Sequence, residues 1–467
     1  MPRFDAAAPV RMQRVAVVAP RSRLRETLVR IAEIGRIELD RVEGGRARQV
    51  PAASRLGRLR RPPGMVTLSA SRPDLDALEH DGRADLLAGE AELEAFADQA
   101  AGDGEAAALT GWCPASDVAE AATRVAEVGA AIVLLRAPRG HDPPTMLRDD
   151  GALRRSYAPL VRAYGTVPYA DLDPTVPAGL AYAVMFGMMF GDLGHGALLL
   201  VAALCLRSGR PAALARSRAL WPFVAGAAVA SMLAGILYGE FFGPTGVVPA
   251  LWLRPLDEPL RLLTAAVVIG VVLLAVAYVV AFVNRRREQG PGYAWYATSG
   301  GGGAALFAGC VLLAVALVSG GAVLLAVGGV LAVAGLVLSG VGLYAGTAGG
   351  PGGAAQAGVE LVDSVMRLGS NIVSFTRLAA FGLTHAALGA IIWDGTTASA
   401  RRGGAAWLAA VALFAVGNAL AFALEALVAG VQAMRLEYYE LFSRVFVSQG
   451  RPFRPWHPPV QRTEVAA

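Results

Sequence analysis

From Ala178 onward, the sequence is dominated by apolar stretches long enough to cross a lipid bilayer. A bilayer core requires about 20 apolar residues in a helix. Seven stretches reach that length: 178–206, 219–243, 261–284, 300–319, 321–345, 364–394 and 404–434. The composition of the 467 residues agrees, because 55% are hydrophobic and only 17% are charged, against about 25% charged in soluble domains. The chain is therefore predicted to be an α-helical polytopic membrane protein, and neither a soluble nor a disordered one.

Arginine positions predict how these stretches cross the membrane. Arginine near the ends of membrane helices favours the cytoplasm, and four arginines lie between the first two stretches, at positions 207, 210, 216 and 218. With a cytoplasmic N-terminus, a single first crossing would place them outside. If stretch 178–206 is a hairpin that turns at Gly191–Gly194, they return to the cytoplasm. We therefore expect about eight membrane helices, the first two forming a hairpin, with both termini cytoplasmic in the cell membrane.

The first part of the chain has a different pattern and no apolar run long enough to span a bilayer. Two strand–helix–strand patterns are expected, over Val15–Ala19, Ser22–Gly35 and Ile37–Leu39, and again over Leu109–Trp112, Ser116–Val128 and Ala131–Leu135. They suggest two βαβ-like lobes, with residues 41–75 as a loop. The predicted domains are a cytoplasmic α/β domain over 1–140, a linker over 141–175 and a membrane domain over 176–467. The run Val15–Ala19 is too short to be the core of a signal peptide.

Several kinds of chemistry are not predicted. The three cysteines are far apart in the sequence, which supports neither a disulfide framework nor a cysteine metal site. The sequence contains no lysine, so a phosphate-binding P-loop is impossible. The pI of about 9.3 comes from arginine in a chain rich in Ala and Gly, a bias typical of GC-rich genes, and it is poor support for nucleic-acid binding. We expect no cofactor, no metal and no nucleic-acid partner, and no enzymatic activity in this chain alone.

Ionisable groups inside membrane helices are costly and mark functional sites. One set recurs at helical spacing from the start of stretch 364–394: Asp363, Arg367, Ser370, Ser374, Arg377 and Thr384. At 100° per residue, these side chains are predicted to share one face, with His385 at its edge. Arg377 is the deepest cation and stays charged because the pKa of arginine exceeds 12. The alternatives for Arg377 are snorkelling to the interface or a static ion pair with Glu425.

Stretch 404–434 carries a second polar face. Asn418, Glu425 and Gln432 recur every seven residues, and Arg435 follows at the cytoplasmic end. Asn418 and Gln432 have an alternative role in hydrogen bonding between helices.

Four ionisable positions have structural interpretations. The alternative for His385 is packing in the helix bundle. Asp192 and His195 are expected to cap helix ends at the hairpin turn, and Glu240 is expected to be solvated at the outer interface.

Four sequence blocks together resemble one family, the membrane-embedded a subunit of V-type and A-type rotary ATPases, called subunit I in bacteria. The blocks are Asp173–Thr175 with Met185–Gly196, Gly235–Gly243, Ser370–Ala386, and Leu424–Phe442 with Pro452–Phe453. The resemblance covers residues 140–467. It implies an eight-helix stator subunit that forms two ion half-channels against a rotor ring, and couples H⁺ or Na⁺ translocation to ATP hydrolysis or synthesis on other chains.

The resemblance also implies roles for individual residues. Arg377 corresponds to the ring-facing arginine, Asp363, Glu425 and His385 correspond to half-channel groups, and Arg435 corresponds to a second arginine. Ser374 and Gln432 complete the expected ion-path set. The implied partners are a rotor ring of proteolipid c/K subunits, peripheral-stalk E/G-type subunits, a central-stalk C/d-type subunit and membrane lipid.

Members of the family usually carry a long helical coiled coil between the two cytoplasmic lobes. The chain departs from this pattern, because only residues 41–105 separate its two predicted lobes and no sustained heptad repeat occurs there. Two other functional classes stay open at this point. A stand-alone secondary transporter would show inverted internal repeats, and a non-conducting assembly scaffold would not require Arg377.

Overall fold

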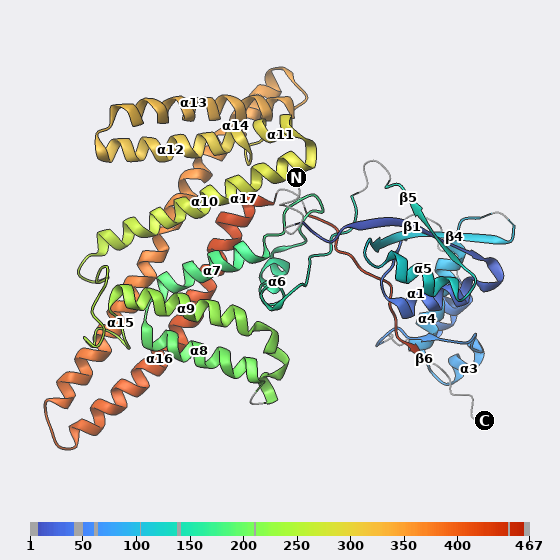
Figure 1. The fold of residues 1–467 in the computed structure, drawn as a ribbon, viewed down its shortest axis with the longest axis horizontal. Helices are drawn as coiled ribbons and strands as arrows, with labels where there is room; N and C mark the ends of the chain where they lie inside the picture. The colour runs from blue at the N-terminus through green and yellow to red at the C-terminus, as the bar shows by residue number, and fades with distance from the viewer. Residues whose placement is uncertain are drawn as a thin grey trace. The chain divides into compact units, whose positions relative to one another are not determined.

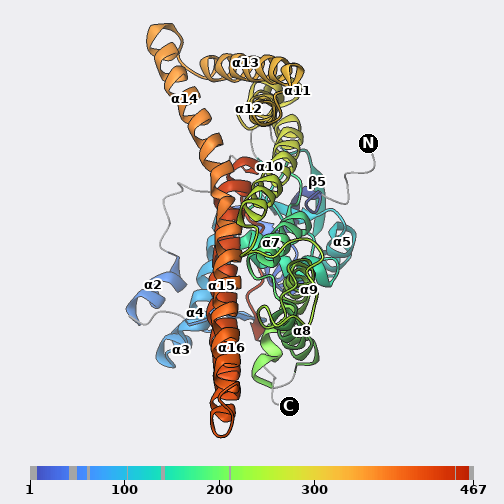
Figure 2. The same ribbon diagram turned by 90° about the vertical axis from the view of Figure 1, so that its left-hand side faces the viewer.

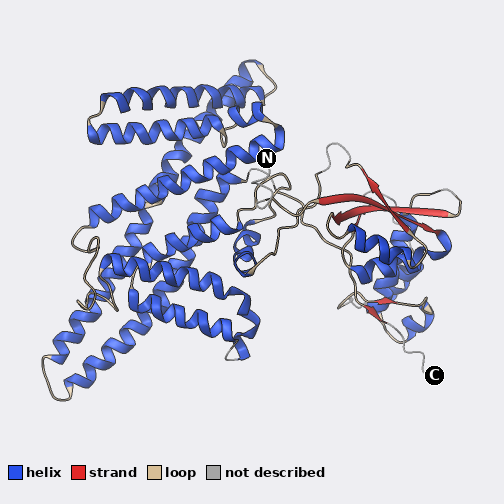
Figure 3. Cartoon of the chain, in the orientation of Figure 1, coloured by secondary structure: helices blue, strands red, loops and turns tan. Residues whose placement is uncertain are grey.

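The computed structural model describes residues 8–41, 50–59, 64–102, 104–137, 142–209, 212–446 and 449–461. The chain divides into two compact units. Arg148–Gln449 form a helical unit, and Ala8–Leu147 together with the tail from Gly450 form a second unit, called here the sheet unit. Strands are concentrated in the sheet unit (Figure 3). The predicted domain boundaries at 140/141 and 175/176 therefore do not coincide with the boundaries between the two units, at 147/148 and 449/450.

The sheet unit is built on one four-stranded antiparallel sheet (Figure 1). Its two strand–helix–strand segments are β1 (Met12–Pro20), α1 (Leu24–Ile34) and β2 (Glu38–Leu39), then β4 (Ala106–Pro114), α5 (Val118–Ala126) and β5 (Ala131–Leu135). The strand order is β2-β4-β1-β5, so each segment leaves a gap that a strand of the other segment fills. The expectation of two separate lobes is therefore wrong: the two segments interleave in one sheet.

The segment between β2 and β4 is largely helical. It contains α2 (Pro51–Arg58), α3 (Leu75–His80) and α4 (Ala84–Gln99), with the two-residue strand β3 (Leu68–Ser69). Leu93 and Phe96 of α4 join Leu28 and Ile31 of α1 in the main core. The prediction of a continuous loop over 41–75 is wrong for Pro51–Arg58, which form α2 and pack against α4, and for Leu68–Ser69, which form β3.

The C-terminal tail belongs to the sheet unit. Strand β6 (Val460–Gln461) pairs in parallel with β3. Trp456 is 7% exposed, packs edge-on against Phe96 at 5.0 Å and donates a hydrogen bond from Nε1 to Glu92 at 2.8 Å. Arg451 forms an ion pair with Glu38 at 2.9 Å. The end of the chain, which the sequence placed in the membrane domain, is thus part of the core of the other unit.

The helical unit consists mainly of long apolar helices, with several short ones between them. In chain order, its helices are α6 (Ala152–Tyr164), α7 (Thr175–Met189), α8 (Leu193–Ser208), η3 (Ala212–Leu220), α9 (Trp221–Tyr238), α10 (Pro259–Gln289), α11 (Pro291–Tyr296), α12 (Gly301–Ser319), α13 (Ala322–Ala345), α14 (Gly350–Ser374), α15 (Thr376–Ala400), α16 (Ala406–Leu436), the π-helical turn η4 (Glu437–Phe442) and α17 (Ser443–Val445). Among the described residues, six helical segments are long and apolar enough to cross a membrane, and α7 and α8 are shorter apolar helices.

Helix α6 lies in the predicted linker but packs within the helical unit. Its Tyr157 is buried where α7 and α9 have glycines: a Cβ at Gly179 would lie 2.4 Å from the Tyr157 ring, and one at Gly226 would lie 2.8 Å from its hydroxyl. Small residues allow such close approach between helices in membranes. Residues 152–164 are therefore a packed helix and not a connecting segment.

The polar segment predicted as one helix is broken at Phe375. Helix α14 ends at Ser374 and α15 begins at Thr376, and the chain changes direction between them (Figure 2). The Phe375 ring is fully buried against α10, where a Cβ on Gly270 would lie 2.3 Å from the ring. The expectation of one regular helix through these polar residues is therefore wrong, because Asp363 and Thr384 lie on different sides of a bend.

A buried ionic group connects the loop before α7 to the end of α10. Arg285 is 1% exposed, lies 3.0 Å from Glu288 and 3.8 Å from Asp171, and donates a hydrogen bond to the Val445 carbonyl. Asp171 is fully buried, and neither carboxylate oxygen has a hydrogen-bond partner among the described residues. Burial and the neighbouring Glu288 carboxylate raise the pKa of Asp171 to about 8.

Candidate functional site

The site begins at the break between α7 and α8. The two helices diverge around α9, which packs against both of them (Figures 1 and 2). Backbone groups at a break inside a membrane protein must be satisfied internally. Here the Ser231 hydroxyl donates to the Phe190 carbonyl, and the Leu193 amide donates to the Glu240 carbonyl at 2.9 Å. A Cβ at Gly235 would lie 2.2 Å from the Leu193 nitrogen, so α9 fits against the break only because this residue is glycine.

Asp192 fixes the start of α8. Its Oδ1 accepts a hydrogen bond from the His195 amide at 2.8 Å, which is an N-cap, and its Oδ2 accepts one from the Gly243 amide at 2.9 Å. The predicted capping role is confirmed for Asp192. It does not extend to the His195 side chain, whose two ring nitrogens have no hydrogen-bond partner among the described residues.

The loop after α9 brings a second carboxylate to the break. Glu240 is 5% exposed, and its Oε2 has no hydrogen-bond partner within the described chain. Phe242 has the left-handed φ of 51°, and its ring packs edge-on against His195 at 5.2 Å. A bulky residue adopts such a φ only where surrounding contacts impose it. The expectation that Glu240 is solvated is therefore wrong, since this strained loop buries it.

The third contribution comes from the pair α15 and α16. These helices run side by side (Figures 1 and 2), and His385 Nδ1 on α15 contacts Glu425 Oε2 on α16. The His385 ring also lies 5.1 Å from Phe190 and 5.6 Å from His195. Glu425 therefore pairs with His385 and not with Arg377, which removes the specific ion-pair alternative stated for Arg377.

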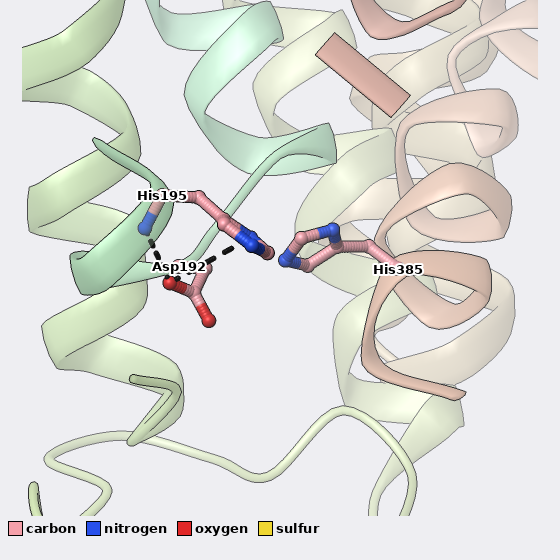
Figure 4. A group of neighbouring side chains, drawn as sticks. All are labelled: Asp192, His195 and His385. Atoms are coloured by element: carbon pink, nitrogen blue, oxygen red, sulfur yellow. Dashed lines mark hydrogen bonds and ion pairs between the residues drawn. The ribbon is translucent and has the colours of Figure 1, made fainter. Parts of the chain in front are cut away.

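These elements converge on one buried group, called here the histidine–carboxylate cluster. Its members are Asp192, His195, Glu240, His385 and Glu425. Figure 4 shows the rings of His195 and His385 turned toward each other, with Asp192 beside His195. Phe190, Phe242 and Phe422 surround the imidazoles. The cluster combines three carboxylates and two imidazoles, groups that exchange protons or bind cations, inside an aromatic enclosure.

A second group surrounds Arg377 at the start of α15. The Arg377 side chain is partly buried, and its Nη1 has no hydrogen-bond partner among the described residues. Ser374 hydrogen-bonds to Glu440 of the π-helical turn, and Glu440 lies within electrostatic range of Arg377 and Arg435. Gln432 carries a buried Oε1 without a partner in the described part of the chain. The arginine group is defined here by Ser374, Arg377, Arg435 and Glu440.

Arg377 lines a groove at the bend between α14 and α15. Residues 365–377 line this groove, which has a volume of about 640 Å³ and includes Ser370, Ser374 and Arg377. Arg377 and His385 are eight residues apart on α15, or about 12 Å along the axis. The arginine group and the histidine–carboxylate cluster thus occupy different levels of the same helix pair.

Asp363 joins neither group. It lies on α14, exposed, and forms an ion pair with Arg367 one turn away. Of the seven predicted site residues, the structure places Ser374, Arg377 and Arg435 in the arginine group, His385 and Glu425 in the cluster, Gln432 on α16 one turn before Arg435, and Asp363 apart.

Sequence reasoning did not include Asp192, His195, Glu240 or Glu440 in the site. The available signal was the position of the first three at interruptions of apolar stretches, where a carboxylate or imidazole needs a buried partner.

Comparison with known proteins identifies relatives of this chain. Residues 98–245 match the V-type ATPase 116kDa subunit family. A-type ATP synthase subunit I of Halobacterium salinarum is 29% identical over 388 residues, which cover 68% of this chain and 52% of that relative. The chain is similar in sequence to proteins named subunit I of A-type and V-type ATP synthases.

Two further relatives of this chain show how far the similarity extends along the sequence. A-type ATP synthase subunit I of Thermococcus kodakarensis is 27% identical over 382 residues, 75% of this chain and 54% of the relative. The human V-type proton ATPase 116 kDa subunit a 3 is 31% identical over 155 residues, 30% of this chain and 19% of that protein. The chain spans about half the length of the archaeal subunit I relatives.

Proposed function

We propose that this chain is the stator subunit of a rotary V/A-type ATPase or ATP synthase, and that it forms two ion half-channels against a rotor ring. It neither binds nor hydrolyses nucleotide itself, and it couples H⁺ or Na⁺ translocation to ATP chemistry on other subunits. The observation that carries the proposal is the pair of polar groups at different levels of α15 and α16, with the unpartnered Arg377 Nη1 in one of them. The sequence similarity to subunit I supports the same role.

The mechanism follows from the permanent charge of Arg377. A carboxylate on a rotor helix must be neutral while it faces lipid, because an isolated charge there is costly. Beside Arg377 its pKa falls and it releases its ion. The positive charge of Arg377 blocks the direct passage of ions between the two half-channels, which are offset from each other. Ion flow therefore requires rotation of the ring. The histidine–carboxylate cluster serves one half-channel, and the arginine group opens toward the other, in which Asp363 lines the outer part.

The membrane topology belongs to the same proposal. The six long helical segments together with α7 and α8 give eight membrane elements, with α7 and α8 as the opening hairpin. Both termini and the sheet unit are cytoplasmic, in the cell membrane of the source organism. The rotor ring of c/K subunits faces the groove at Arg377, and the sheet unit docks E/G-type stalk and C/d-type central-stalk subunits.

Replacement of Arg377 tests the proposal. We expect Arg377→Lys and Arg377→Gln to abolish ATP-driven ion uptake in vesicles that contain the whole complex, while the complex still assembles. Lysine is a compact point charge whose pKa falls on burial, so it does not replace the guanidinium. Glu440 interacts electrostatically with Arg377, so the matched double variant is Arg377→Gln with Glu440→Gln.

A static ion pair and a discharging arginine give different results in this double variant. If the role of Arg377 is structural, neutralising both partners restores uptake. If Arg377 discharges rotor carboxylates, the double variant stays inactive. Substantial uptake by Arg377→Gln alone, or its rescue by Glu440→Gln, would contradict the proposed function.

A further inference from the structure

Three side chains of the histidine–carboxylate cluster have the arrangement of a metal site. One ligand atom from each of Asp192, His195 and His385 lies within 4.8 Å of the other two. All three residues are buried, with exposures of 0%, 2% and 5%. Neither ring nitrogen of His195 makes a hydrogen bond of normal geometry within the described chain, where its polar neighbours are Asp192, with Oδ1 3.8 Å from Nδ1, and the Asn418 side chain. Burial of a polar group without a full hydrogen bond is costly. A ligand at this position would remove that cost.

We propose that Asp192, His195 and His385 bind a divalent transition-metal ion, with Zn²⁺ the best match. Imidazole nitrogen with carboxylate oxygen suits Zn²⁺, whereas Ca²⁺ and Mg²⁺ prefer sites made of oxygen alone. Ligands on a tetrahedral zinc, with bonds of about 2.0–2.2 Å, lie about 3.4 Å apart. The 4.8 Å upper limit for the three ligand atoms therefore requires closure by at most about 1.4 Å.

The surroundings of His385 favour its use as a ligand. A metal-bound histidine almost always donates its other ring N–H to a carboxylate or carbonyl, which fixes the tautomer. His385 Nδ1 already contacts Glu425, which leaves Nε2 available for the metal. Asp192 is equally fixed, because its two oxygens accept hydrogen bonds from the His195 and Gly243 amides and each keeps a free lone pair.

Glu240 lies beside this set. Its Oε2 is buried and has no hydrogen-bond partner in the described chain, and its carboxyl group is close enough to interact electrostatically with His385, Asp192 and Glu425. Three protein ligands with an open fourth position are typical of zinc sites that hold a water or a substrate there.

The metal site has a regulatory consequence, which rests on the proposed function. A Zn²⁺ ion held by His195 and His385 occupies the lone pairs that would accept a transported proton. It also immobilises both rings across the half-channel. Zn²⁺ is therefore expected to inhibit ion transport reversibly, and a chelator is expected to restore it.

Binding is measured first on the purified full chain in detergent, after treatment with a chelator. We expect one Zn²⁺ per chain in competition with a chromophoric chelator, and visible absorption of bound Co²⁺ with the intensity of tetrahedral coordination. His195→Gln should weaken Zn²⁺ binding by more than about 100-fold, since even second-shell changes cost about 10–100-fold. Asp192→Asn removes the anionic ligand but keeps an N-cap acceptor, so it should weaken binding while α8 stays intact.

The matched control is His457→Gln, because His457 is an exposed histidine in the sheet unit. It should leave Zn²⁺ affinity unchanged. Unchanged affinity in both His195→Gln and Asp192→Asn would overturn the metal site, whatever the transport activity.

Transport is measured separately as ATP-driven ion uptake by the whole complex, with and without Zn²⁺. Inhibition that a chelator reverses supports the metal site and the position of the half-channel together. Tight binding without inhibition supports the metal site and contradicts the proposed ion path, so failure of one proposal is distinguishable from failure of the other.

Discussion

Asp171 is an acid that the fold keeps largely protonated near neutral pH. Burial and Glu288 raise its pKa to about 8, from 3.8 in the unfolded chain. Between about pH 4 and pH 8, the folded chain therefore holds a proton that the unfolded chain has lost. The free energy of unfolding then falls as pH rises through this window, by up to about 1.4 kcal/mol per pH unit.

Asp171→Asn should remove this dependence, because asparagine does not ionise. We expect the melting temperature of the purified chain in detergent to fall less between pH 5.5 and 8.5 in Asp171→Asn than in the unaltered chain. The exposed Asp150 provides the control, and Asp150→Asn should leave the pH profile unchanged. Equal profiles for Asp171→Asn and the unaltered chain would show that Asp171 does not carry this proton.

At the scale of single residues, the sequence singles out positions where a residue type has few buried roles. Arg377, His385 and Glu425 lie in long apolar helices, where an ionisable group needs a partner or a function. Glu240 was misinterpreted because its short Gly-containing loop is typical of a solvated turn. Its burial depends on the Asp192–Gly243 hydrogen bond and the strained Phe242, contacts between segments about 50 residues apart.

At the scale of elements, the bend at Phe375 separates the arginine group from Asp363. Gly270→Ala should disturb it, because the new Cβ would lie 2.3 Å from the Phe375 ring. Overpacking of this kind costs about 1–3 kcal/mol, so the melting temperature of the chain should fall.

Gly369 on α14 is the matched control, since a Cβ there meets no atom within 4 Å. Gly369→Ala should leave the melting temperature unchanged or raise it, because alanine favours helix. Similar melting temperatures for the two variants would contradict the proposed role of the Gly270–Phe375 contact.

The proposed hairpin of α7 and α8 makes a separate prediction about sidedness. A cysteine introduced at Ser208, at the end of α8, should react with a membrane-impermeant maleimide only from the cytoplasmic side. Cys113, Cys205 and Cys310 are first replaced by alanine, and labelling in intact cells is compared with labelling in inverted vesicles. Labelling from outside in intact cells would rule out the eight-element topology.

The lengths and order of the apolar helices could be predicted from the sequence, whereas the break inside the seventh stretch could not. Length and hydropathy are local properties, and the six long segments agree with the apolar stretches that follow the first one. The break carries no proline, and Phe375 and Thr376 give no local stop signal. It arises from packing against α10, which sequence periodicity does not describe.

At the scale of the whole molecule, the tail around Trp456 is the least predictable part of the fold. Its Pro-rich sequence has no helical or strand periodicity, yet Trp456 lies in the core of the sheet unit. Trp456→Ala should destabilise that unit by about 3–5 kcal/mol, as for other buried large-to-small changes. In the full chain, we expect tryptic cleavage within residues 8–147 to occur much faster.

His457→Ala provides the control, because His457 is the exposed neighbour of Trp456. It should leave the cleavage rate near that of the unaltered chain. Equal rates for Trp456→Ala and His457→Ala would mean that the sheet unit is stable without the tail.

Because the tail returns to the sheet unit, the described chain passes between the two units at 147/148 and again at 449/450. A unit joined to the rest of a protein by one length of chain is released when that length is cut. Here a single cut at 147/148 would leave the sheet unit held by its own tail, which packs in its core and continues into the helical unit.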